Sequence, residues 1–208
     1  MISLNLKTLT AAITLTSLAI AAPASAKIAT GSTVSDMQVV DSYGVTHNLS
    51  DFAGKNVVLE WTNHGCPYVK KHYESDNMQN LQKEATADGS TVWLSVISSA
   101  PGKQGYVSAD EANALTTSRD AAPSAVVLDP KGTAGRTFSA RTTPHMYVIN
   151  ADQTLVYQGA IDSNRSASAA TIPGATNYVR EALTAVKSGQ PVAMAETAPY
   201  GCNVKYGS

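Results

Sequence analysis

Cysteine is scarce in this chain, whose 208 residues include only Cys66 and Cys202. The two residues allow one intramolecular disulfide, and the long loop that it would close predicts roughly 4 to 5 kcal/mol of stabilisation from chain entropy. In an oxidising compartment their redox state becomes a real variable. The sequence alone leaves open whether the pair is reactive or only ties the chain together.

The chain also lacks an excess of charge of either sign. It has 15 Lys and Arg against 16 Asp and Glu, a formal net charge of −1, and no run of basic residues. Nucleic acids and anionic membrane surfaces bind clustered positive charge. We therefore expect neither as a partner of the folded protein.

Only one long apolar stretch occurs, and it lies near the N-terminus between Leu9 and Ala22. It follows Lys7 and precedes Ala24-Ser25-Ala26, which matches a small-x-small cleavage site. A membrane-spanning helix needs about 20 apolar residues, and this run is shorter. The pattern predicts a signal peptide over residues 1–26, export across the inner membrane, and a mature protein in the periplasm.

The rest of the chain is long enough for one hydrophobic core and too short to argue for two domains. We predict one domain over residues 27–190. A C-terminal tail over residues 191–208 then carries Cys202.

Strand and helix patterns alternate through the predicted domain. Two short apolar runs around Asp41-Ser42-Tyr43-Gly44 predict an N-terminal β-hairpin. Composition and spacing predict further strands at 56–61, 91–97, 124–128, 146–149 and 154–161, and helices at 67–87, 112–118, 133–138 and 178–186. This order predicts an α/β fold with a central mixed sheet and helices on both faces.

Cys66 follows the predicted strand 56–61 and precedes a helix that begins at Pro67. Reactive groups in such sheets gather beyond the carboxyl ends of the strands. The free N–H groups and the positive dipole end of the helix favour a thiolate, and Lys70 and His64 are near enough in sequence to add to this effect. Cys66 is therefore the candidate nucleophile, with a buried and inert cysteine as the alternative.

The segment from Glu60 to Lys71, Glu-Trp-Thr-Asn-His-Gly-Cys-Pro-Tyr-Val-Lys-Lys, resembles the active-site turn of thioredoxin-like redox proteins. It is most similar to the peroxiredoxin-like branch, the redoxins of the alkyl hydroperoxide reductase and thiol-specific antioxidant group, with Gly65 inserted before Cys66. Thr143-Pro144 before the strand that starts at His145 resembles the Thr-Pro of the same folds, whose proline is cis beside the reactive cysteine. The resemblance covers about residues 34–186.

This resemblance implies a thioredoxin-like fold and an antioxidant enzyme that reduces peroxides through a Cys66 thiolate. It requires no cofactor and no metal, and it implies an external thiol reductant, such as a thioredoxin-like protein, as a partner. Cys66 and Cys202 would be the catalytic residues. The supporting residues would be Thr62, Asn63, His64, Pro67, Lys70, Arg141, Thr143, Pro144 and His145.

The sequence departs from the family pattern at three places. Val69 stands where thioredoxins have a second cysteine, so Cys66 cannot pair within its own helix. Asn63 stands where peroxiredoxins have threonine, with Thr62 one step further away, and Arg141 does not match the family arginine cleanly. Cys202 is left as the resolving thiol, as a permanent staple of the tail, or as an unpaired residue.

Three functions therefore remain open, with peroxide reduction slightly ahead. The second is a periplasmic thiol–disulfide oxidoreductase that acts on protein disulfides. The third is a binding domain without enzymatic activity, with either a structural Cys66–Cys202 disulfide or a metal site formed by Cys66, His64 and His145. Glu60, at a buried strand end, is a candidate proton relay because burial would raise its pKa.

Overall fold

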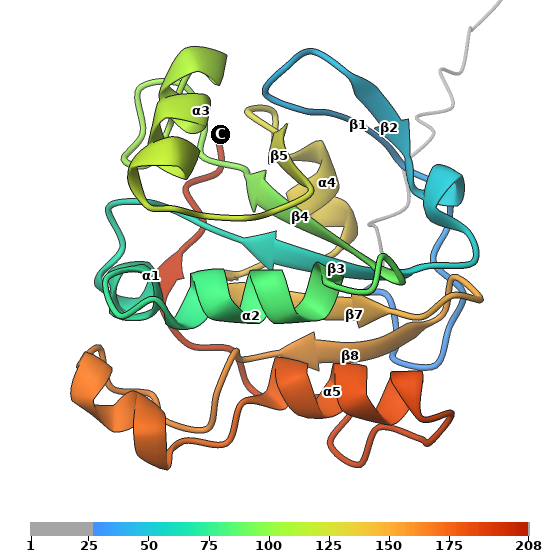
Figure 1. Ribbon diagram of the computed structural model, residues 1–208. Helices are drawn as coiled ribbons and strands as arrows, with labels where there is room; N and C mark the ends of the chain where they lie inside the picture. The colour runs from blue at the N-terminus through green and yellow to red at the C-terminus, as the bar shows by residue number, and fades with distance from the viewer. Residues whose placement is uncertain (1–26, 208) are drawn as a thin grey trace, which may run out of the picture.

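The computed structural model describes residues 27–207 (Figure 1). The signal peptide predicted over residues 1–26 lies outside the described residues. Across residues 27–207, no helix has both the length and the apolar character needed to cross a membrane. The predicted division into a domain over 27–190 and a tail over 191–208 stays a prediction.

A five-stranded sheet in the order β5-β4-β3-β7-β8 forms the centre of the fold. Strands β3, β4 and β5 run parallel to one another. Strand β7 is antiparallel to both of its neighbours, β3 and β8, which confirms the predicted mixed sheet. Every residue of β3 and β4 is buried, as expected for central strands covered on both faces. The bounds are β3 (Asn56–Trp61), β4 (Thr91–Ile97), β5 (Ala125–Leu128), β7 (His145–Ile149) and β8 (Leu155–Gly159).

The predicted N-terminal hairpin is present as β1 (Gln38–Val40) and β2 (Thr46–Asn48), which pair antiparallel. The Asp41 carboxylate closes the turn by accepting hydrogen bonds from the backbone N–H groups of Tyr43 and Val45, both at 2.9 Å. This is the turn chemistry by which aspartate favours such positions.

Helices cover both faces of the sheet, as predicted (Figure 1). Side chains alternate across β3, so Val58 lies in the hydrophobic cluster shared with α1, α2 and α5, whereas Leu59 and Trp61 lie in the cluster beneath α4 and the hairpin. The helices are α1 (Pro67–Tyr73), α2 (Asn77–Thr86), α3 (Ala109–Ser118), α4 (Thr133–Thr137) and α5 (Tyr178–Lys187), with short 3₁₀ turns η1 (Leu49–Phe52) and η2 (Ala169–Gly174).

The continuous helix predicted over residues 67–87 is wrong, because the chain breaks between α1 and α2. Asp76 adopts a left-handed conformation with φ of 57°. The Ser75 hydroxyl donates to the carbonyl of Lys71 at 2.7 Å, and the Gln79 side-chain amide donates to the carbonyl of Tyr73 at 2.8 Å. Side chains thus satisfy carbonyls at the end of α1, which removes the penalty for stopping the helix there.

The predicted irregular tail contains one short strand, β9 (Cys202–Asn203). This strand pairs antiparallel with β6 (Thr142–Thr143), so that Cys202 lies opposite Thr143. The pairing places the end of the chain beside Thr143, whose carbonyl accepts a hydrogen bond from the Cys66 thiol. The tail is therefore part of the folded structure, which local sequence patterns did not indicate.

Tyr206 fixes the last part of the tail against α4. Its hydroxyl donates to the carbonyl of Ala140 at 2.7 Å, and the Arg136 guanidinium lies 4.7 Å from the centre of its ring. The ring occupies space that glycine leaves open, since a Cβ at Gly132 would lie 2.5 Å from it.

Gly135→Ala should therefore loosen the end of the tail. A Cβ at residue 135 would lie 2.4 Å from the Tyr206 hydroxyl oxygen, although alanine by itself favours a helix over glycine by about 1 kcal/mol. We expect amides around Tyr206 to lose protection in hydrogen exchange. Gly174→Ala is the matched control, because its Cβ meets nothing within 4 Å. Unchanged protection in the Gly135 variant would contradict this packing.

Candidate active site

Cys66 is the N-cap residue of α1, directly after the loop that follows β3. Its backbone N–H donates to the carbonyl of Asn63 at 3.0 Å, and its carbonyl accepts from the N–H of Lys70 at 2.9 Å. The side chain is 1% exposed. Its Sγ donates to the carbonyl of Thr143 at 3.1 Å, so the thiol faces the segment before Pro144.

The loop before Cys66 is held by an amide pair that the sequence did not reveal. Asn63 Nδ2 donates to Gln104 Oε1 at 2.8 Å, and Gln104 Nε2 donates back to Asn63 Oδ1 at 3.1 Å. A Cβ at Gly65 would lie 2.0 Å from Gln104 Nε2, so a larger residue there would displace the Gln104 amide from its present position. Gln104 lies in a loop without periodic pattern, and no signal in the sequence singled it out.

Thr143 lies opposite Cys66, because its carbonyl accepts the hydrogen bond from the thiol. The Thr143–Pro144 peptide bond is cis, which confirms the conformation implied by the resemblance. Thr143 is 2% exposed, and its hydroxyl donates to the carbonyl of Cys202 at 3.4 Å. Thr143 therefore touches both cysteines, through its carbonyl to Cys66 and through strand pairing to Cys202.

The two thiols are free and close enough to influence each other's ionisation. Burial opposes ionisation of Cys66, but hydrogen bonds from the Cys202 thiol and from the backbone N–H groups of Val69 and Cys202 outweigh it, so the pKa of Cys66 is lowered. Burial and the neighbouring Cys66 raise the pKa of Cys202 to about 12. Cys66 is thus the thiol of the pair that ionises more readily.

His145 does not approach Cys66, and this prediction was wrong. Side chains alternate along β7, and His145 shares a face with Tyr147, whose ring centre is 4.6 Å away, whereas Cys66 clusters with Met146. The imidazole Nδ1 lies 3.1 Å from the Tyr147 hydroxyl and accepts the backbone N–H of Arg141 at 3.3 Å. Burial lowers the pKa of His145 to about 3.

His64 lies in a cleft of about 540 Å³ between α1, α2 and α3, which Lys70, Tyr73 and Arg119 also line. Burial and the nearby Arg119 charge lower the pKa of its imidazole. Among residues 27–207, no three His, Cys, Asp or Glu side chains gather as a metal site. The structure therefore does not bring Cys66, His64 and His145 together.

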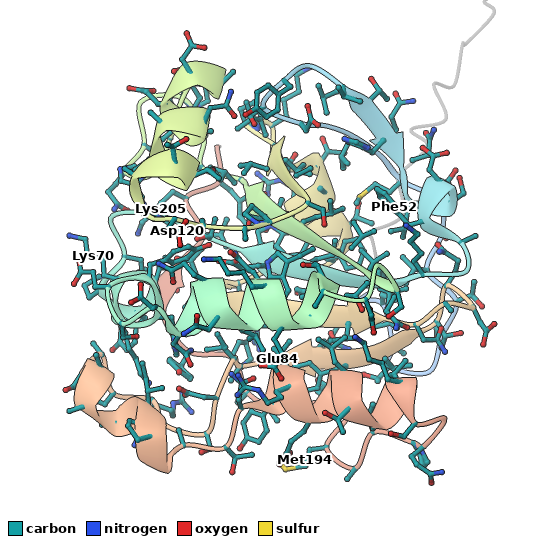
Figure 2. All side chains as sticks on the ribbon, in the orientation of Figure 1. Phe52, Lys70, Glu84, Asp120, Met194 and Lys205 are labelled. Carbon is teal, nitrogen blue, oxygen red and sulfur yellow. The ribbon has the colours of Figure 1, made fainter. Side chains whose placement is uncertain are left out.

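The other predicted supporting residues do not hydrogen-bond to the Cys66 thiol through their side chains. Pro67 begins α1, and Lys70 extends away from the body of the protein into solvent (Figure 2). Arg141 contributes its backbone, because its carbonyl accepts the N–H of Val204 at 3.0 Å. Thr62 has a buried hydroxyl oxygen without a hydrogen-bond partner.

Glu60 is fully buried on the face of β3 that carries α1 and α2. Burial raises the pKa of its carboxyl group, as predicted, although hydrogen bonds from four side chains oppose the rise. Its role as a proton relay stays a prediction. The four donors are Tyr73 at 2.8 Å, Trp93 at 2.9 Å, Ser95 at 3.0 Å and Gln82 at 3.2 Å.

A buried cysteine at the N-terminus of a helix, with its thiol on the residue before a cis proline, is typical of a thioredoxin-like protein. The Redoxin family model matches residues 29–177, and the chain belongs to this family. Membership of this family supports a thiol-based oxidoreductase. A comparison with curated proteins gave no match.

Solved structures agree on the fold. A hypothetical protein from Sinorhizobium meliloti 1021 superimposes with a TM-score of 0.72 at 19% identity over 88% of this chain and 97% of that chain. An uncharacterized conserved protein from Geobacillus kaustophilus gives a TM-score of 0.71 at 19% identity, covering 86% of this chain and 93% of that chain. At such identities the likeness establishes the fold alone.

Removing one thiol should move the pKa of the other. In Cys202→Ala the pKa of Cys66 should rise, because the strongest group favouring its thiolate is gone. In Cys66→Ala the pKa of Cys202 should fall. Ultraviolet absorbance of the thiolate followed against pH measures both. An unchanged Cys66 titration in Cys202→Ala would contradict the contact between the thiols.

Two buried imidazoles should make the fold sensitive to mild acid. Burial lowers the pKa of His145 to about 3 and that of His72 to about 4. Below about pH 6.5 the unfolded chain binds protons that the folded chain does not, so stability falls as the pH drops towards 4. Each imidazole should contribute about 1.4 kcal/mol per pH unit. Denaturant unfolding across this range should give a shallower slope for His145→Gln than for the wild type, and equal slopes would show the assignment to be mistaken.

Proposed function

We propose that this protein is a thiol–disulfide oxidoreductase whose redox-active pair is Cys66 and Cys202. The main support is the β6–β9 pairing, which sets Cys202 opposite the residue whose carbonyl binds the Cys66 thiol at 3.1 Å. A strand pair that brings two free thiols together suits reversible disulfide formation better than a permanent staple, since an accessible disulfide is the exchangeable kind. The substrates are thiols and disulfides, and an external thiol reductant completes the cycle.

External partners would exchange at Cys202. Cys66 is 1% exposed, whereas Cys202 is partly exposed on the outer strand β9. An external thiolate attacks the Cys202 sulfur of the disulfide, the Cys66–Cys202 bond breaks, and Cys66 leaves as a thiolate. A second external thiolate then releases the mixed disulfide as an external disulfide, and Cys202 takes up a proton. Two electrons thus pass to the protein.

The pKa values of the two thiols support this direction. A thiol with a lower pKa leaves faster in disulfide exchange. The pKa of Cys66 is lowered by the Cys202 thiol and the backbone N–H groups around it despite its burial, whereas that of Cys202 is raised to about 12. Cys66 is thus the better leaving group and Cys202 the more accessible sulfur.

Peroxide reduction is the second candidate, and the lowered pKa of Cys66 favours it. The Cys66 thiolate would attack one peroxide oxygen, giving a sulfenic acid and releasing an alcohol or water. Cys202 would condense with the sulfenic acid, forming the disulfide and releasing water. This candidate ranks second because the polar neighbours of Cys66 are Thr143, Cys202 and backbone groups, not Arg141.

We also propose that this activity takes place outside the cytoplasm, in the periplasm of the cell that exports the protein. The support is the sequence of residues 1–26, with one early lysine, an apolar run and a small-x-small end.

Reaction of the reduced protein with a chromogenic aromatic disulfide, followed by mass mapping, tests the proposal. The wild type should end with a Cys66–Cys202 link, and Cys66→Ala should retain a mixed disulfide on Cys202. Cys202→Ala should form no intramolecular link and should retain at most a mixed disulfide on Cys66, because Cys66 is then the one cysteine in the sequence.

A parallel assay follows hydrogen peroxide consumption by the three proteins in the presence of a small thiol reductant. Peroxide loss that depends on Cys66, without catalysed disulfide exchange, would reverse the order of the two candidates. A Cys66–Cys202 link that never opens would leave the protein a binding domain.

A further inference from the structure

A buried cluster of charged and polar groups contacts the tail at Tyr200, two residues before Cys202. Lys71 Nζ lies 3.1 Å from Asp162 Oδ2 and donates to the carbonyl of Asn164 at 2.9 Å. The Tyr200 hydroxyl donates to Asp162 Oδ1 and lies 3.5 Å from the lysine nitrogen. The side chains of Lys71 and Asp162 are 0% and 4% exposed.

This cluster joins three separate parts of the fold. Lys71 belongs to α1, Asp162 follows β8, and Tyr200 belongs to the tail. A buried ion pair contributes little net stability compared with apolar residues of the same volume, because its charges lose their hydration. Its directional bonds nevertheless define where each part sits. A gain in core stability therefore does not explain why the Tyr200 hydroxyl binds the Asp162 carboxylate.

Both cysteines are close in sequence to a member of the cluster. Cys66 caps the same helix that carries Lys71, and Cys202 follows Tyr200 by two residues. Between them Gly201, at φ 136°, passes so near the Thr143 carbonyl that a Cβ would lie 2.1 Å from its oxygen. Since consecutive Cα atoms are about 3.8 Å apart, the anchor at Tyr200 limits how far Cys202 can move.

We infer that Lys71, Asp162 and Tyr200 are positioning residues that hold the Cys202 thiol against Cys66. This inference rests on the proposed function. Holding the strand in place raises the effective concentration of one thiol at the other, and this concentration sets how readily the intramolecular disulfide forms. The cluster acts through the tail and touches neither sulfur.

Tyr200→Phe tests the inference with the smallest change, because it removes the hydroxyl and keeps the ring, whose centre lies 5.8 Å from that of Tyr68. The reduced protein is equilibrated with graded mixtures of a reduced and an oxidised small thiol, and the Cys66–Cys202 link is quantified by alkylation and mass mapping. We expect the equilibrium constant for closing the disulfide to fall by about tenfold, a shift of about 30 mV towards easier reduction.

Tyr147→Phe is the matched control. It also deletes a buried hydroxyl, which donates to the carbonyl of Phe138 at 2.9 Å on the opposite face of the sheet. Its disulfide equilibrium should match the wild type, even where denaturant unfolding finds a similar loss of stability in both variants. An unchanged equilibrium in Tyr200→Phe, or an equal shift in both, would overturn the inference.

The rate of closure provides a second measurement. A mixed disulfide formed on Cys202 should persist about tenfold longer in Tyr200→Phe than in the wild type, because Cys66 meets it less often. Asp162→Asn should show the same effect, provided that circular dichroism confirms its fold. Failure of the proposed function would be recognised differently, because the wild type itself would then form no reversible Cys66–Cys202 link.

Discussion

Two backbone pairs, Thr142 with Asn203 and Thr143 with Cys202, tie the end of the chain to the segment before Pro144. The candidate chemistry depends on this contact, because α1 offers Cys66 no second thiol in its own turn. Thr143 serves both sides at once, binding the Cys66 thiol through its carbonyl and the tail through strand pairing. A protein without the helix-borne second cysteine of thioredoxins thus obtains one from a distant part of the sequence.

The same contact makes the two thiols unequal. Cys66 lies at the N-terminus of a helix, where free N–H groups stabilise a thiolate, and Cys202 lies on a peripheral strand beside that charge. The thiol with the lowered pKa is therefore the buried one, and the thiol with the raised pKa is the partly exposed one. In thiol exchange, Cys66 would then be the better leaving group and Cys202 the more accessible sulfur. A single exposed cysteine would have to combine these two properties.

Local patterns predicted most of the core and the position of Cys66. The bounds predicted for β3 and β4 match the structure because each is a continuous buried run flanked by turn residues. The helix break at Asp76 and the strand formed by the tail could not be predicted in this way, since Gln79, Tyr200 and Tyr206 there bind groups that are distant in sequence. The placement of His145 beside Cys66 was avoidable, because side-chain alternation along β7 directs it to the other face.

The proposed chemistry requires the tail to bring a reversible partner thiol to Cys66. Titration of the protein against a graded redox buffer, with acid quenching, alkylation and mass mapping of each cysteine, tests it most directly. If Cys202 is that partner, the titration shows one two-electron transition in which Cys66 and Cys202 react together and yield a single intramolecular link. Independent titration of the two cysteines, or links formed only between molecules, would contradict it.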